Sequence, residues 1–76
     1  MKGGETMDEY KLLHDFGRNL KDLLNESCMC QRELSELTRI SESTISRYIA
    51  GDAMPSLVNV VKIMRVLECT FEDLVD

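Results

Sequence analysis

Residues 31–50, with the sequence QRELSELTRISESTISRYIA, decide the fold of this chain. The fifth residue of the stretch, Ser35, is small, and apolar side chains stand at its fourth, tenth, fifteenth and eighteenth positions, occupied by Leu34, Ile40, Ile45 and Tyr48. A small fifth residue lets two helices cross closely, and the apolar side chains hold the second helix at a fixed angle to the first. The stretch therefore predicts two short helices joined by a tight turn.

The ends of both helices are marked in the sequence. The first is predicted over Gln31–Thr38, with Leu34 and Leu37 facing inward. The second begins after Ser41, whose hydroxyl is a good N-cap, and stops at Gly51, since glycine commonly follows a helix end. Its inner side chains are Ile45, Tyr48 and Ile49, and its outer ones are Glu42, Ser43, Thr44, Ser46 and Arg47.

Another helix is predicted before this stretch. Thr6 and Glu9 have the spacing of a capping box at its start. Gly17 is a weak interruption, and residues 25–28 form the loop that ends the helix. Steps of three and four residues place its apolar side chains on one face, namely Leu12, Leu13, Phe16, Leu20, Leu23 and Leu24.

Two more helices are predicted after the stretch. Pro55 and Ser56 open the first of them, and Thr70 caps a short final helix that ends near Val75. No segment alternates apolar and polar residues as an exposed strand does, so the predicted class is all-α with five helices. The inner face of the helix after Pro55 is predicted to hold Leu57, Val60, Val61, Met64 and Leu67.

The spacing within residues 31–50 resembles the helix-turn-helix motif of DNA-binding proteins. Its continuation through Gly51, Pro55, Leu67 and Leu74 resembles the phage lambda repressor and Cro-like (Xre) family over about residues 16–75. The resemblance implies a compact five-helix, lambda-repressor-like domain. It also implies that the third helix enters the major groove of double-stranded DNA, which is wide enough to admit an α-helix.

The resemblance assigns roles to polar residues. Gln31 matches a phosphate-contacting glutamine that also braces the third helix, and Arg32 is a further candidate for phosphate. Glu42, Ser43 and Arg47 occupy positions that touch base edges in the family. The positions of phosphate or secondary contacts hold Ser41, Thr44 and Ser46.

The chemistry of these side chains suits base reading. Arg47 can donate two hydrogen bonds to O6 and N7 of guanine, and Glu42 can accept one from a cytosine amino group. Glu42 also repels phosphates, so an ion pair with Arg39 or Arg47 is an equal alternative. The competing interpretation of the whole set is a solvated polar helix face.

The chain departs from the family pattern at several positions. Arg39 stands where the turn usually has glycine, so either a positive φ there strains the backbone or the turn differs slightly from the family's. Ser35 replaces the usual alanine and brings a hydroxyl that needs a partner, and Thr38 replaces an apolar residue. Leu24 and Ile49 stand where the family often has a buried ion pair, and such an exchange is often neutral or stabilising.

The residues available for phosphate contacts depart most from the family pattern. The loop at residues 51–55 contains an acid and no Lys or Arg, although this loop is commonly basic in DNA-binding members. The chain has 9 basic and 14 acidic residues, a net charge of −5, but residues 28–51 hold three of each sign. The cations that stand as substitutes are Arg18, Lys21, Arg32 and Arg39.

Length and composition limit the remaining functions. Seventy-six residues hold one small domain, predicted at 6–76 after a flexible tail at 1–5. The three cysteines are expected as free thiols, and the single histidine completes no zinc site with them. With no Gly-rich phosphate loop and no catalytic triad, we predict no enzyme, metal, cofactor or small-molecule effector. Without a long apolar run or a signal peptide, we predict a cytoplasmic location without membrane contact.

The last third of the chain carries more apolar residues than one buried face requires. Exposed apolar clusters often mark protein contacts, and a homodimer would place two recognition helices about one DNA turn, near 34 Å, apart. The equal alternative is a larger core. The candidates for a dimer interface are Val58, Ile63, Val66, Phe71, Leu74 and Val75.

Two functions are consistent with the sequence. The first is a sequence-specific transcriptional regulator that binds a palindromic operator as a dimer. The second is a protein-interaction module of the same fold, an antitoxin-like or regulatory partner with weak or no DNA binding, which the acidic charge balance favours.

Overall fold

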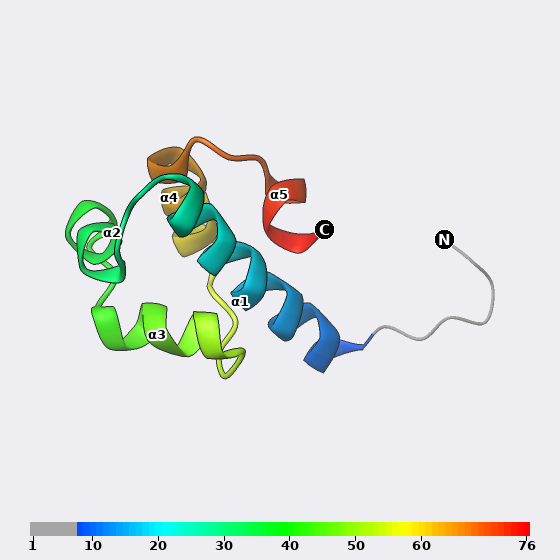
Figure 1. The fold of residues 1–76 in the computed structure, drawn as a ribbon. Helices are drawn as coiled ribbons and strands as arrows, with labels where there is room; N and C mark the ends of the chain where they lie inside the picture. The colour runs from blue at the N-terminus through cyan, green and yellow to red at the C-terminus, as the bar shows by residue number, and fades with distance from the viewer. Residues whose placement is uncertain (1–7) are drawn as a thin grey trace.

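The computed structural model describes residues 8–76, and within them the chain forms five helices and no strand, which confirms the predicted all-α class (Figure 1). The long helix α1 packs against α3 and α5, while α2 packs against α3 and α4. The helices are α1 Glu9–Glu26, α2 Gln31–Thr38, α3 Glu42–Ala50, α4 Leu57–Leu67 and α5 Phe71–Val75. The predicted tail at residues 1–5 and the predicted cap Thr6 lie outside the described residues. No helix of residues 8–76 is both long and apolar enough to cross a lipid bilayer.

Most helix ends follow the capping chemistry predicted for them. The hydroxyls of Ser41, Ser56 and Thr70 accept hydrogen bonds from the third backbone N–H of α3, α4 and α5, and Gly51 ends α3 with a φ of 79°. The start of α1 differs, because Asp8 is its N-cap and accepts a hydrogen bond from the Lys11 N–H. A carboxylate suits this place, because it also compensates the positive end of the helix dipole.

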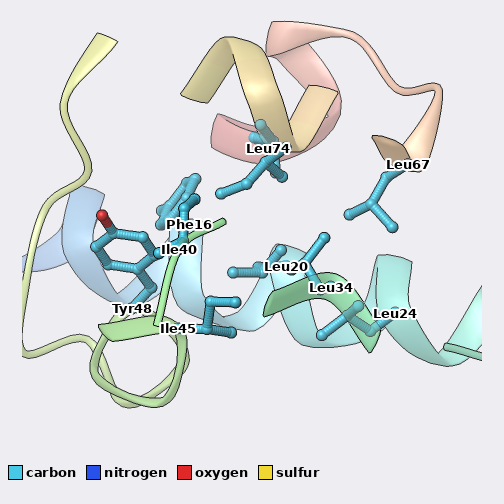
Figure 2. Packing of buried hydrophobic residues seen from close by; sticks show 10 residues of the cluster. Phe16, Leu20, Leu24, Leu34, Ile40, Ile45, Tyr48, Leu67 and Leu74 are labelled. Atoms are coloured by element: carbon cyan, nitrogen blue, oxygen red, sulfur yellow. The ribbon is translucent and has the colours of Figure 1, made fainter. Parts of the chain in front are cut away.

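A core of ten buried apolar side chains joins all five helices (Figure 2). Leu20 of α1, Leu34 of α2 and Ile45 of α3 are fully buried within it. The Asn19 side chain donates a hydrogen bond of 3.0 Å to the Leu74 carbonyl, which ties α1 to α5. The ten residues are Phe16, Leu20, Leu24, Leu34, Ile40, Ile45, Tyr48, Ile63, Leu67 and Leu74.

The predicted inner face of α4 is wrong in part. Leu57 is 78% exposed and Val61 is exposed, whereas Ile63, which was placed off the inner face, is fully buried. Ile63 and Leu67 lie four residues apart, and they therefore share the face of the helix that meets the core. Eight of the eleven residues of α4 are apolar, so the polar residues do not mark the buried face unambiguously.

The prediction for Leu37 is also wrong. This side chain is 62% exposed, and the inner position of α2 four residues after Leu34 belongs to Thr38, which is 2% exposed. The Thr38 hydroxyl donates to the Leu34 carbonyl at 2.7 Å and accepts from the Ile40 N–H at 3.2 Å. Because both hydrogen bonds are made, a threonine fits where the family usually has an apolar residue.

Candidate nucleic-acid interface

Helix α3 has one buried side and one exposed polar side. Ile45 and Tyr48 are buried and Ile49 is half-buried. Glu42, Ser43, Ser46 and Arg47 are exposed, while Thr44 is half-buried. Of the residues expected to touch DNA from this helix, all but Thr44 therefore present their side chains to solvent.

Three hydroxyl groups meet at the N-terminus of α3. The Ser41 Oγ accepts from the Thr44 N–H at 3.2 Å and donates to the Thr44 Oγ1 at 2.8 Å. The Ser41 and Ser43 Oγ atoms lie 3.2 Å apart. This cluster holds the first turn of α3 in a defined conformation, and it commits the Thr44 hydroxyl to a partner inside the protein.

The buried side of α3 is attached to two other helices. The Tyr48 ring meets the Phe16 ring of α1 edge to face, with centroids 5.9 Å apart and planes at 75°. The Tyr48 hydroxyl accepts a hydrogen bond of 3.0 Å from the Asn59 side chain of α4. Helix α3 is thus fixed in orientation through its buried side, where Figure 2 shows Tyr48 beside Phe16, while its polar side stays accessible.

Gly17 permits the close contact between α1 and α3. A Cβ atom at this position would lie 2.4 Å from the Tyr48 carbonyl oxygen and 2.6 Å from that of Ile49. Both distances are far below van der Waals contact, so only glycine lets the end of α3 approach α1 this closely. The sequence pattern marked Gly17 only as a weak interruption, although a glycine inside an apolar helical stripe can signal such an approach.

The N-terminus of α2 carries two of the predicted phosphate contacts. Gln31 is half-buried at the first position of the helix, and Arg32 is exposed beside it. The Glu33 carboxylate accepts a hydrogen bond of 3.2 Å from the Cys30 N–H. The Arg32 Nε lies 3.8 Å from the Glu36 Oε2, so this guanidinium already has an acidic neighbour.

The turn between α2 and α3 has a residue in the left-handed region. Arg39 is the C-cap of α2 with φ 64° and ψ 21°, and its N–H donates to the Ser35 carbonyl at 2.9 Å. The expected strain at this position is therefore present, because a side chain disfavours positive φ. Cys28 and Glu68, at the ends of α1 and α4, share this conformation with φ of 53° and 52°.

The charges near α3 are few and mostly unpaired. Arg39 and Arg47 are exposed and form no ion pair with any of residues 8–76. Glu42 likewise has no ionic partner in this part of the chain, so the alternative that it pairs with Arg39 or Arg47 is wrong for this structure. Asp52 is exposed in the loop after α3, where no cation accompanies it.

A second group of charges surrounds Asp15 on α1. The Lys11 Nζ donates to the Asp15 Oδ2 at 2.8 Å, and the Arg18 Nη1 lies 3.6 Å from Oδ1. The hydrogen bond from Lys11 lowers the pKa of Asp15 below its ordinary value, burial opposes this change, and the charges of Lys11, Arg18 and His14 lower the pKa further. His14 itself is exposed on the helix surface, as expected. Arg18 is thus engaged with a carboxylate on its own helix.

The six candidates for a dimer interface do not share one surface. Ile63 and Leu74 are fully buried in the core, so their assignment to an exposed interface is wrong. Val58 and Phe71 are exposed, the latter at 55%, and Val66 and Val75 are half-buried. An apolar groove adjoins Phe71, and its lining comprises Leu12, Phe16, Met54, Pro55, Val60, Phe71 and Val75.

The cysteines form no metal centre in the described part of the chain. Cys28 and Cys30 are exposed free thiols and Cys69 is a half-buried one. Burial raises the pKa of the Cys69 thiol, and the nearby negative charge of Asp73 raises it further. Residues 8–76 bring together no group of three side chains suited to hold a metal ion.

Comparison with known proteins agrees with this geometry. The sequence model of the helix-turn-helix family (HTH_3) matches residues 20–74. The crystal structure of the restriction-modification controller protein C.AhdI from Aeromonas hydrophila superposes with a TM-score of 0.77 at 27% identity, covering 82% of this chain and 94% of that chain. No curated protein sequence matches. The five-helix fold expected from the lambda-repressor resemblance is thereby confirmed.

Proposed function

Because this chain belongs to the helix-turn-helix family, whose members are DNA-binding regulators and not enzymes, we propose that it is a sequence-specific transcriptional regulator. One observation carries the proposal: α3 exposes Glu42, Ser43 and Arg47 on one side while Ile45 and Tyr48 fix its other side in the core. A helix held in this way can enter the major groove with its polar side chains directed at base edges.

Base reading falls to three side chains of α3. Arg47 has no ionic partner among residues 8–76, so its guanidinium is available to O6 and N7 of a guanine. Glu42 accepts from a cytosine amino group, and Ser43 contacts a base from the first turn. Each good bidentate contact contributes about 1–3 kcal/mol of discrimination between bases.

Contacts to phosphate set the register on the duplex. Gln31 and Arg32 stand at the start of α2, which crosses the DNA backbone in this class of domain. Ser41 and Ser46 are exposed on α3, and Thr44 acts as a secondary contact that orders the first turn. Such contacts supply affinity that does not depend on sequence and falls with salt.

A homodimer would place two copies of α3 on the two halves of a palindromic operator. The exposed side chains of Val58 and Phe71, with the half-buried Val66 and Val75, provide the apolar surface for a second copy. Two-fold symmetry would then separate the half-sites by about one helical turn of DNA. The structural likeness to C.AhdI, itself a controller protein, supports a regulatory role.

Selection from a random pool of DNA duplexes at low salt tests the function. We expect enrichment of a palindrome with half-sites about 10 base pairs apart, and affinity for it that falls steeply with salt. Arg47→Ala should lower affinity for the selected sequence by about 1–3 kcal/mol and relax preference at one position of each half-site. Arg65→Ala, an exposed position on α4, is the matched control and should bind as the unsubstituted protein does.

If Arg47→Ala changes neither affinity nor sequence preference, the proposed recognition of bases by α3 is excluded. Absence of binding to every duplex at low salt would favour the second candidate, a protein-interaction module. The net charge of −5 and the exposed Asp52 after α3 are the observations in favour of that candidate, because both suit a basic protein partner. Specific co-purification of one basic protein would then support it.

A further inference from the structure

We propose that Arg39, at the turn between α2 and α3, contacts a DNA phosphate and that the chain keeps an arginine there against the preference of its backbone. The inference rests on the proposed DNA-binding function and names a residue that the family pattern does not supply, since glycine is usual at this place. Three observations carry it: the conformation of Arg39, its lack of an ionic partner, and its position next to the N-terminus of α3.

The backbone at Arg39 is one that a side chain disfavours. With φ 64° and ψ 21°, the residue lies in the left-handed region, where a Cβ atom crowds the following carbonyl oxygen. Glycine has no such penalty, and the local hydrogen bond from the Arg39 N–H to the Ser35 carbonyl would be equally available to it. Cys28 and Glu68 share this left-handed conformation in residues 8–76, and of the three Arg39 is the one beside the N-terminus of α3, so we look for a functional contact of its side chain there.

No interaction within the described protein supplies that explanation. Arg39 is exposed and forms no ion pair or side-chain hydrogen bond with residues 8–76. Two of the other cations weighed as phosphate contacts differ in this respect, because Arg18 lies beside Asp15 and Arg32 lies beside Glu36. Of the three arginines in residues 31–50, Arg47 belongs to the base-reading face and Arg32 already has Glu36 beside it, so Arg39 adds a phosphate contact from a guanidinium that has no ionic partner in residues 8–76.

The position of Arg39 suits a phosphate. In a docked helix-turn-helix domain the first helix crosses the DNA backbone and the N-terminus of the second enters the groove. Arg39 lies between these two elements, two residues before the N-cap Ser41. Its guanidinium is thus placed at the edge of the groove, where the phosphates of one strand pass.

A cation at this edge also compensates for the lack of positive side chains in the loop after α3. The loop after α3 has the exposed acid Asp52 and no Lys or Arg through residue 56, so it offers no positive side chain to the other strand. An arginine at the turn restores one phosphate contact per protomer on the opposite side of α3. Guanidinium suits this role because it donates paired hydrogen bonds to phosphate oxygens.

The test uses the full-length protein, a mixed-sequence DNA duplex and four variants. Arg39→Gly removes the charge and the strain, Arg39→Gln removes the charge alone, and Arg39→Lys keeps the charge. Glu68→Gly is the matched control, because Glu68 has the same left-handed conformation with φ 52° at the end of α4. Melting temperature and the dependence of the binding constant on salt are measured for each.

We expect opposite changes in stability and binding for Arg39→Gly. Its melting temperature should rise by about 4–8 °C, as it should for Glu68→Gly, because both relieve one left-handed residue. Its affinity for the duplex should fall about fivefold per protomer, and the slope of log K against log salt should become shallower by about one per protomer. Arg39→Gln should lose binding equally without the gain in stability, and Arg39→Lys should retain most of the slope.

A purely structural role gives a different pattern. A cation at the C-terminal end of α2 would stabilise that helix through its dipole, and Arg39→Gln would then lower the melting temperature and leave the salt slope unchanged. Binding of Arg39→Gly and Arg39→Gln with the unaltered slope overturns the proposal while the DNA-binding function stands. If the unsubstituted protein binds no duplex, the function and the role of Arg39 both fail.

Discussion

The pair α2–α3 exposes one large apolar side chain, Leu37, whereas the pair α4–α5 exposes four, namely Leu57, Val58, Val61 and Phe71. Both pairs bury comparable apolar residues in the same core, so the difference lies in the outer surfaces. A polar outer surface fits a hydrated, charged partner such as duplex DNA, while an apolar one fits another protein surface. The two halves of this small domain are thus suited to two kinds of contact.

The largest effect that would test this division concerns the core under α4. Ile63→Ala should destabilise the protein by about 2–5 kcal/mol, because Ile63 is fully buried and its truncation leaves a cavity. Val58→Ala, on the exposed side of the same helix, should change stability by no more than about 0.5 kcal/mol. Urea unfolding of both variants measures the difference. Equal losses would mean that α4 presents a different face to the core, and the comparison between the two surfaces would no longer hold.

Gly17 offers a test of how α3 is held. Alanine usually stabilises a helix interior relative to glycine by about 1 kcal/mol, but here its Cβ would overlap two backbone carbonyls of α3. Because overpacking typically costs about 1–3 kcal/mol and backbone atoms yield poorly, we expect Gly17→Ala to lower stability by about 2 kcal/mol. It should also weaken DNA binding in excess of the stability loss, since α3 must shift.

Asn25→Ala, a neutral and exposed position on the same helix, is the control for this change. Chemical denaturation and duplex binding are measured on both variants under conditions where each is folded. A stabilised Gly17→Ala protein with unchanged binding would show that the contact between α1 and α3 is looser than the structure has it.

The sequence predicted the fold well, because helix ends depend on local chemistry. The Ser41 and Thr70 hydroxyls accept hydrogen bonds from nearby backbone N–H groups, and Gly51 adopts the left-handed backbone that ends α3. These three predicted positions are therefore confirmed. At Arg39 the family resemblance left open either a strained positive φ or a slightly different turn, and the structure has the positive φ.

Features that depend on how helices meet could not be read in this way. With eight apolar residues in eleven, α4 has several faces that could be buried, and only its packing against α2 and the shared core selects the one with Ile63. The roles of Gly17 and Asn59 arise from contacts with other helices, so the sequence marked Gly17 only as an interruption of its helix and did not mark Asn59. The DNA-contacting roles on α3 stay predictions, since exposure of a side chain does not show what it touches.

The smallest effect compares equivalent caps in the two halves of the molecule. Ser41 caps α3 and Thr70 caps α5, each by accepting a hydrogen bond of 3.2 Å from a backbone N–H. Ser41→Ala and Thr70→Ala should each cost about 1 kcal/mol of stability, because one N–H at the start of a helix loses its partner. The two variants should therefore lose equal stability, and they differ only in which helix loses its cap. Thermal unfolding followed by duplex binding should show a loss of affinity for Ser41→Ala alone, since Ser41 also orders Ser43 and Thr44 at the edge of the proposed interface. Equal binding by both variants would show that the N-terminus of α3 does not contact DNA. The polar surface of α2–α3 and the apolar surface of α4–α5 would then not correspond to two kinds of partner.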